Sequence, residues 1–125
     1  MTLDLIDDPV VLPGLAPEWD ELLAAMPRPS PFLSSTWIAT WWEHFGGSSR
    51  LWLITARDRN GRLQGLAPLH CVRRRVAWFV SVRSLEFLGY RGSAVCADHL
   101  DFLSRPEGRV AIVRALAAEA RRRGG

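Results

Sequence analysis

The 125-residue sequence predicts a mixed α/β domain, in which helices flank a mostly antiparallel sheet. An Asn60-Gly61 pair separates two apolar segments, residues 51–56 and 62–72, and this pattern is typical of a β-hairpin. Two amphipathic segments precede the hairpin and one follows it, each with apolar residues at helical spacing. We therefore expect a strand, two helices, several strands and a final helix, in one domain over residues 1–125.

The first half of the chain is predicted to contain an edge strand and two helices. Residues 2–6 alternate between apolar and polar side chains, and residues 15–27 have a helical apolar stripe with Pro17 in the first turn. A second helix is expected to begin after Ser34 or Ser35 and to end at Gly46. Its wide apolar face, which predicts burial, consists of Trp37, Ile38, Trp41, Trp42 and Phe45.

The second half is predicted to build most of the sheet. Residues 51–56 are apolar on both faces, as in a central strand. Pro68 cannot donate a backbone hydrogen bond, so the returning strand needs a bulge or a free edge there. Residues 73–92 indicate one or two further strands, residues 99–103 a short strand, and residues 107–123 the last helix.

Composition limits the classes of partner. All sixteen basic residues are arginine, but a net charge of +3 does not by itself predict nucleic-acid binding, so we expect none. The acidic N-terminus differs from a secretory signal, and the longest apolar stretch, residues 76–82, is much shorter than the ~20 residues of a membrane span. Two cysteines do not form a disulfide framework. We expect a cytoplasmic protein without a membrane span.

Most residues with chemical potential lie between Cys96 and Val110. Cys96, Asp98, His99 and Asp101 are possible metal ligands, but Asp98 and His99 point to opposite faces of a strand and no CxxC or HxxxH pattern exists, so no metal is predicted. Our hypothesis is that Asp98, His99 and Asp101 contact a substrate amine or hydroxyl. The alternative is that His99 and Asp101 bind each other or the last helix.

Arginines cluster where the later strands are expected. Arg73, Arg74, Arg75 and Arg83 form either a solvated face or a site for an anionic substrate, such as a sugar nucleotide or a lipid-linked phosphate. We take Arg73 and Arg75 as candidate substrate-binding residues. His44 and His70 are expected to be surface or core residues rather than bases.

Three segments carry a resemblance to a known family: "FLSSTWIATWWEHFGG", "LWLITARDRNGRLQGLAPLH" and "LEFLGYRGSAVCADHLDFL". Over residues 19–123 the chain resembles GNAT-like acyltransferases of the CelD cellulose-biosynthesis type, which are related to the FemAB peptidoglycan aminoacyltransferases. The shared features are packing and turn residues, not a catalytic signature. The resemblance implies a partly splayed GNAT-like sheet and the first half of a longer two-half protein. The parent protein would use acetyl-CoA or another acyl-CoA for N- or O-acyl transfer in polysaccharide or cell-envelope synthesis.

The resemblance also implies a cofactor-binding turn. GNAT enzymes hold the CoA diphosphate with a Q/R-x-x-G-x-G/A turn before a helix, where backbone N–H groups bind the anion. Arg105, Gly108 and Arg109 are the corresponding candidates, but Val110 stands where the pattern has glycine or alanine.

A helix cap competes with the cofactor turn for the same residues. Ser104 and Glu107 have the spacing of a capping box, which would use the N–H groups that a diphosphate needs. The sequence favours the cap, and the donor site is then expected chiefly in the second half.

Catalysis in this family would need a base for the attacking amine and an acid for the departing thiolate. Glu86 lies in the strand that would correspond to the family's fourth strand, and Tyr90 is the only tyrosine, so these two are the candidates. The alternative is that Glu86 faces solvent beside Arg83 and Tyr90 covers a strand end. We expect this chain alone to be inactive and the acceptor to be a small molecule or glycan precursor.

A function of a different class remains open. The chain is alternatively a non-catalytic binding or scaffold module, which docks an anionic ligand or a protein through an exposed sheet edge and its arginines. Nothing follows the final helix to cover that edge, so we expect it to pair with a C-terminal half or with a second copy.

Overall fold

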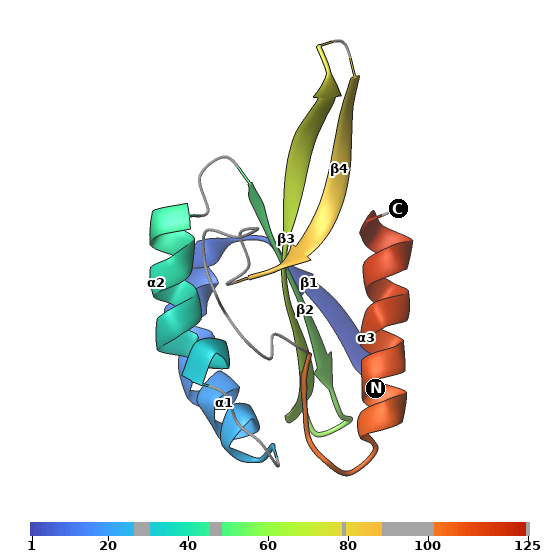
Figure 1. The fold of residues 1–125 in the computed structure, drawn as a ribbon. Helices are drawn as coiled ribbons and strands as arrows, with labels where there is room; N and C mark the ends of the chain where they lie inside the picture. The colour runs from blue at the N-terminus through green and yellow to red at the C-terminus, as the bar shows by residue number, and fades with distance from the viewer. Residues whose placement is uncertain (27–30, 46–48, 79, 89–101, 125) are drawn as a thin grey trace.

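The computed structural model describes residues 1–26, 31–45, 49–78, 80–88 and 102–124 (Figure 1). It describes the backbone alone for residues 32, 45, 73–76, 80–87 and 124. The elements are β1 (Thr2–Ile6), η1 (Pro9–Val11), α1 (Leu12–Ala24), η2 (Pro31–Leu33), α2 (Ser35–Phe45), β2 (Arg50–Arg57), β3 (Leu63–Ala77), β4 (Val80–Phe87), β5 (Leu103–Ser104) and α3 (Arg109–Gly124). The predicted mixed fold, with helices flanking an antiparallel sheet, is confirmed.

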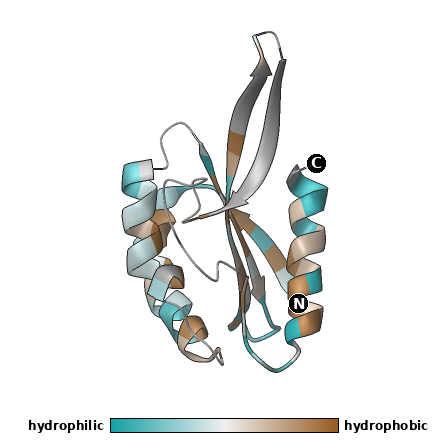
Figure 2. Cartoon of the chain, in the orientation of Figure 1, coloured by the Kyte–Doolittle hydropathy of each residue, from teal (hydrophilic) through white to brown (hydrophobic). Residues whose placement is uncertain are grey.

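The sheet has the order β1-β2-β3-β4, and β5 also pairs with β3; every pairing is antiparallel. Helices α1 and α2 cover one face and α3 covers the other (Figure 1). Alternate residues of β2 therefore enter two different cores: Leu51 and Leu53 pack with α1 and α2, while Ile54 and Ala56 pack with α3. Figure 2 shows apolar residues on the sheet and on the inner sides of the helices.

The hairpin between β2 and β3 confirms the predicted turn, with a five-residue loop instead of two residues. Asp58 organises the loop, because its Oδ1 accepts hydrogen bonds from the backbone N–H of Asn60 (2.9 Å) and Arg62 (3.0 Å). Gly61 has a φ of +81°, a conformation that glycine adopts at little cost. The register shifts at a bulge between Ala56 and Arg57, where the loop joins the strands.

Helix α1 positions the start of α2. The Nε1 of Trp19 donates to the carbonyl oxygen of Leu33 (2.7 Å), and the carboxylate of Asp20 accepts from the N–H and the hydroxyl of Ser35 (3.0 and 2.7 Å). Ser34 caps α2, as predicted, by accepting from the N–H of Trp37 (3.2 Å). The side chains of Trp19 and Asp20 thus hold the start of α2 against α1.

Helix α1 begins earlier than the sequence indicated. It starts at Leu12 with Pro13 in its first turn, so Pro17 lies inside the helix instead of at its beginning. Both prolines suit the first turn of a helix, and the prediction that Pro17 takes this place is wrong, because Pro13 takes it.

Pro68 lies where the partners of β3 change. On one side β3 pairs with β2 from Leu63 to Cys71; on the other, β5 pairs with Gly65 and Leu66, and β4 pairs from Leu69 onward. The carbonyl oxygen of Pro68 accepts from the N–H of Leu88 (2.8 Å) on this second side. A residue's N–H and C=O point to the same side of an antiparallel strand. The missing N–H of Pro68 therefore faces the point where β4 and β5 diverge, and the predicted interruption of the ladder takes this form.

A glycine in β3 permits the close approach of α3. A Cβ added at Gly65 would lie 2.4 Å from Ile112 Cγ2 and 3.2 Å from Leu116 Cδ1. We predict that Gly65→Ala lowers the free energy of unfolding by about 1–3 kcal/mol, because well-packed interfaces resist added volume. Urea denaturation measures this change.

Two further variants test that explanation. Gly14→Ala in α1, where an added Cβ meets nothing within 4 Å, is the matched control and should not destabilise the chain. Ile112→Leu removes the clashing Cγ2 branch and should reduce the cost of Gly65→Ala in a double-mutant cycle. Equal stability of Gly65→Ala and wild type would contradict the explanation.

Candidate functional site

The turn between β5 and α3, residues 105–108, contains two of the three predicted cofactor-binding residues, and is called the β5–α3 turn below. The N–H of Arg105 donates to the carbonyl oxygen of Gln64 (3.0 Å), so the turn leaves directly from the β3 ladder. Gly108 has a φ of +74°, with open space where a Cβ would be, and α3 begins at the next residue. The backbone at Gly108 is thus exposed at the N-terminus of a four-turn helix.

The guanidinium of Arg105 is directed inward. Its Nε donates to the carbonyl oxygen of Leu63 (3.0 Å) and its Nη2 to the carboxylate of Glu21 (3.1 Å), and its side chain is only 12% exposed. Glu21 also accepts from Arg62 (3.1 Å), and hydrogen bonds from Arg62 and Arg105 lower the pKa of its carboxyl. Arg105 therefore ties the turn to β3 and α1.

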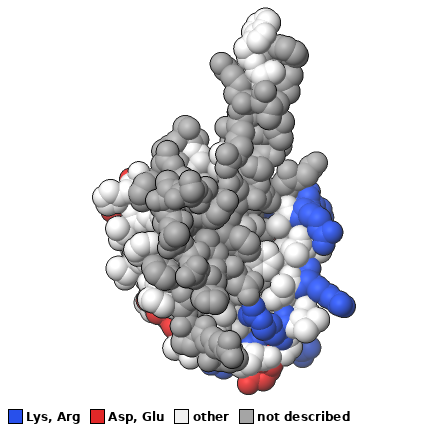
Figure 3. All heavy atoms as spheres, viewed as in Figure 1, with Lys and Arg blue, Asp and Glu red and all other residues white. Residues whose placement is uncertain are grey.

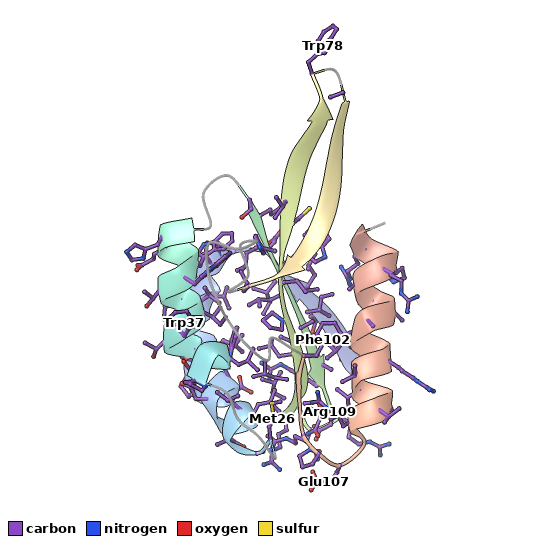
Figure 4. All side chains as sticks on the ribbon, viewed as in Figure 1. Met26, Trp37, Trp78, Phe102, Glu107 and Arg109 are labelled. Carbon is purple, nitrogen blue, oxygen red and sulfur yellow. The ribbon has the colours of Figure 1, made fainter. Side chains whose placement is uncertain are left out.

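The predicted capping box is wrong. Ser104 lies buried in β5, and α3 starts only at Arg109 because Gly108, with its positive φ, cannot belong to the helix. The Ser104 hydroxyl instead accepts from Nη1 of Arg109 (2.9 Å), which also donates to the carbonyl oxygen of Phe102 (3.4 Å). Figure 4 places Glu107 at the outer side of the turn and Arg109 between the sheet and α3.

These contacts determine how the β5–α3 turn could hold an anion. The guanidinium of Arg105 and Nη1 of Arg109 bind protein oxygens, and the exposed Glu107 carboxylate repels negative charge. The N–H of Arg109 already donates to the carbonyl oxygen of Pro106 (3.4 Å), so an anion would meet the N–H groups of Gly108, Val110 and Ala111, beside the 67% exposed side chain of Val110. An anion at this turn would therefore meet backbone N–H groups and not the Arg105 guanidinium.

A second cluster, missed by the sequence analysis, surrounds His70 on the α2 side of the sheet. His70 is 5% exposed, and its Nδ1 lies 3.1 Å from the hydroxyl oxygen of Ser49, just before β2. The His70 ring packs edge-to-face with Trp41 (centroids 5.1 Å apart) and Trp42 (6.4 Å). His70 is thus a core residue, one of the two places expected for it, and its ring is hydrogen-bonded to the Ser49 hydroxyl.

The strand register places some of the other candidates. Glu86 lies opposite His70 in the β3–β4 ladder, Arg73 lies opposite Arg83, and Arg75 lies opposite Ser81. Only the backbone of Arg73, Arg75, Arg83 and Glu86 is described, so their proposed roles stay predictions. Tyr90, Cys96, Asp98, His99 and Asp101 lie outside the described residues, and their roles stay predictions as well.

A bidentate ion pair joins the hairpin to α1 near the β5–α3 turn. Nη1 and Nη2 of Arg57 donate to the two carboxylate oxygens of Glu18 (2.6 and 3.0 Å), and Nη1 also donates to the carbonyl oxygen of Gly61 (2.8 Å). The hydrogen bonds from Arg57 lower the pKa of Glu18.

The outer face of α3 is basic. Figure 3 shows blue side chains along this side of the molecule, and the exposed arginines of the helix are Arg114, Arg121, Arg122 and Arg123. Arg122 and Arg123 bind Glu119, so Arg114 and Arg121 contribute most of the uncompensated charge on this face.

Comparison of the chain with protein-family models, with curated proteins and with solved structures gave no match. Within the described ranges, no group of three or more His, Cys, Asp or Glu residues is placed to bind a metal ion. A search of the helices in the same ranges finds none with the length and apolar character needed to cross a bilayer.

The Glu18–Arg57 pair predicts a pH-dependent contribution to stability. Because the pKa of Glu18 is lower in the folded state, its contribution is present above the pKa of the unfolded chain and is lost as the pH falls through the folded value. The side chain of Glu18 is 43% exposed, so solvent screening limits the effect to about 0.5–1 kcal/mol near neutral pH.

Glu18→Gln should therefore destabilise the chain near neutral pH and match wild type at acidic pH. Urea denaturation across this pH range measures the difference, with Glu43→Gln on the exposed side of α2 as the control. A difference that grows as the pH falls would contradict the assignment.

Proposed function

We propose that this chain is the N-terminal portion of a GNAT-like acyltransferase, which transfers an acyl group from acetyl-CoA or another acyl-CoA to an amine or hydroxyl. The observation that carries the proposal is the divergence of β4 and β5 along β3 at Pro68, with α3 following β5 through a glycine turn. A partly splayed sheet with a glycine turn before a helix is what the sequence resemblance implies.

The donor's diphosphate would bind at the β5–α3 turn. The groups that would hold it are the N–H groups of Gly108, Val110 and Ala111, because these lie at the positive end of the helix dipole and the N–H of Arg109 already donates to Pro106. When bound, an acyl-CoA supplies an activated acyl carbonyl. Arg105 remains tied to Leu63 and Glu21, so the turn alone gives weak binding, and a C-terminal half supplies the remaining contacts.

The acceptor chemistry is assigned to the β3–β4 ladder. Glu86 takes the proton from the attacking amine or hydroxyl, and Tyr90 gives a proton to the departing thiolate. Glu86 lies opposite His70 in the register, so a buried imidazole and the Ser49 hydroxyl adjoin the strand position of the base. Asp98, His99 and Asp101 contact the acceptor, a small molecule or glycan precursor.

Isothermal titration calorimetry of this chain with acetyl-CoA tests the donor site. We expect weak saturable binding by wild type and about fivefold tighter binding by Glu107→Ala, because the variant removes one negative charge next to the diphosphate. Glu43→Ala removes an exposed charge on α2, remote from the turn, and should bind like wild type.

One result of this titration would contradict the donor site. If neither wild type nor Glu107→Ala binds acetyl-CoA while circular dichroism shows both folded, the β5–α3 turn is not a donor site. The proposal then loses the structural observation on which it rests.

A further inference from the structure

The strands β3 and β4 extend beyond the rest of the sheet as a two-stranded ribbon. Strand β2 pairs with β3 only as far as Cys71, whereas β4 continues to pair with β3 from Val72↔Ser84 to Ala77↔Val80. Residues 72–78 and 80–84 are called the ribbon below. Figure 1 shows the ribbon projecting from the domain, and Figure 4 shows Trp78 at its tip.

The tip exposes a tryptophan. Trp78 is 83% exposed, whereas Trp19, Trp41 and Trp52 are buried and Trp37 and Trp42 are half-buried. Tryptophan combines a large apolar ring with a polar N–H group, and it is enriched where an apolar phase meets water. Of the six tryptophans, the one at the tip is thus placed to meet an external apolar phase.

The ribbon also concentrates positive charge. It contains four arginines and no acidic residue, whereas the whole chain has a net charge of +3, so the remainder of the chain is negative by one. The register sets Arg73 directly opposite Arg83, a like-charge pair that destabilises an isolated ladder. A two-stranded ribbon is already marginal in water, and an anionic surface would offset this repulsion.

We propose that the ribbon binds the surface of an anionic lipid bilayer, with Trp78 in the headgroup region and the arginines near the lipid phosphates. At a rise of about 3.3 Å per residue, Arg75 and Arg73 lie roughly 10 and 16 Å along the strand from Trp78. A headgroup layer is roughly 5–8 Å thick and screening acts over about 8–10 Å, so a tilted ribbon brings these charges within range of the phosphates. This attachment is independent of the proposed acyl transfer.

The bilayer is favoured over a protein partner because of the composition of the ribbon. An aromatic tip followed by several arginines matches the layers of a membrane surface, in which the deepest group lies nearest the apolar core and the groups behind it lie at the anionic phosphates. A protein surface would instead need a complementary pocket for Trp78 and acidic residues at the spacing of the arginines.

Vesicle co-sedimentation of the whole chain tests this proposal. We expect binding to vesicles of phosphatidylcholine mixed with phosphatidylglycerol, and binding at least about tenfold weaker to phosphatidylcholine alone. Trp78→Ser should weaken binding to the anionic vesicles about tenfold, and Arg73→Gln about fivefold. Two exposed residues outside the ribbon provide matched controls: Val10→Ser (Val10 is 76% exposed) and Arg114→Gln should bind like wild type.

Fluorescence gives a second, independent measurement. Brominated lipids should quench part of the tryptophan emission of wild type on anionic vesicles, and should quench Trp78→Ser at most slightly, since the other described tryptophans are buried or half-buried.

Three results would overturn the proposal. The first is a folded wild-type chain that does not bind anionic vesicles. The second is undiminished binding by Trp78→Ser. The third is self-association in sedimentation equilibrium that requires Trp78 while vesicle binding is absent, which would make the ribbon a contact between copies of this chain.

Discussion

The pairing of β3 is the constraint on which the rest of the fold depends. This strand is the only described one with partners on both sides that change along its length: β2 on one side, and β5 followed by β4 on the other. Both cores rest on it, because Leu66 packs with α1 and α2 while Ala67 packs with α3. The divergence of β4 and β5 at Pro68 and the close approach of α3 at Gly65 both occur in one four-residue segment of β3, residues 65–68.

The sequence predicts the elements that depend on local pattern. The Asn60-Gly61 hairpin, the Ser34 cap and the apolar faces of the helices follow from residue type and spacing, and the structure has them. The start of α3 could not be predicted in this way. A serine three residues before a glutamate indicates a helix cap. Ser104 instead lies in β5 and pairs with Gly65 of β3, which is distant in sequence.

The candidate site was less predictable than the fold. The contact between Ser49 and His70 depends on the register of β2 and β3, which shifts by one residue at the bulge between Ala56 and Arg57. No residue type marks that bulge, and a one-residue shift exchanges the faces of every later side chain. Gly108 lies in the β5–α3 turn and Arg109 begins α3, but the inward direction of Arg105 depends on Glu21, which lies 84 positions earlier.

The late arrival of β5 has a consequence for synthesis of the chain. The edge of β3 at Gly65 and Leu66 pairs with Ser104 and Leu103, which are translated 39 and 37 residues later. At roughly 5–20 residues per second, that edge leaves the ribosome about 2–8 s before its partner. An unpaired strand edge is a template for other chains. The nascent polypeptide therefore passes through an interval in which this edge is open to pairing with a neighbouring nascent chain.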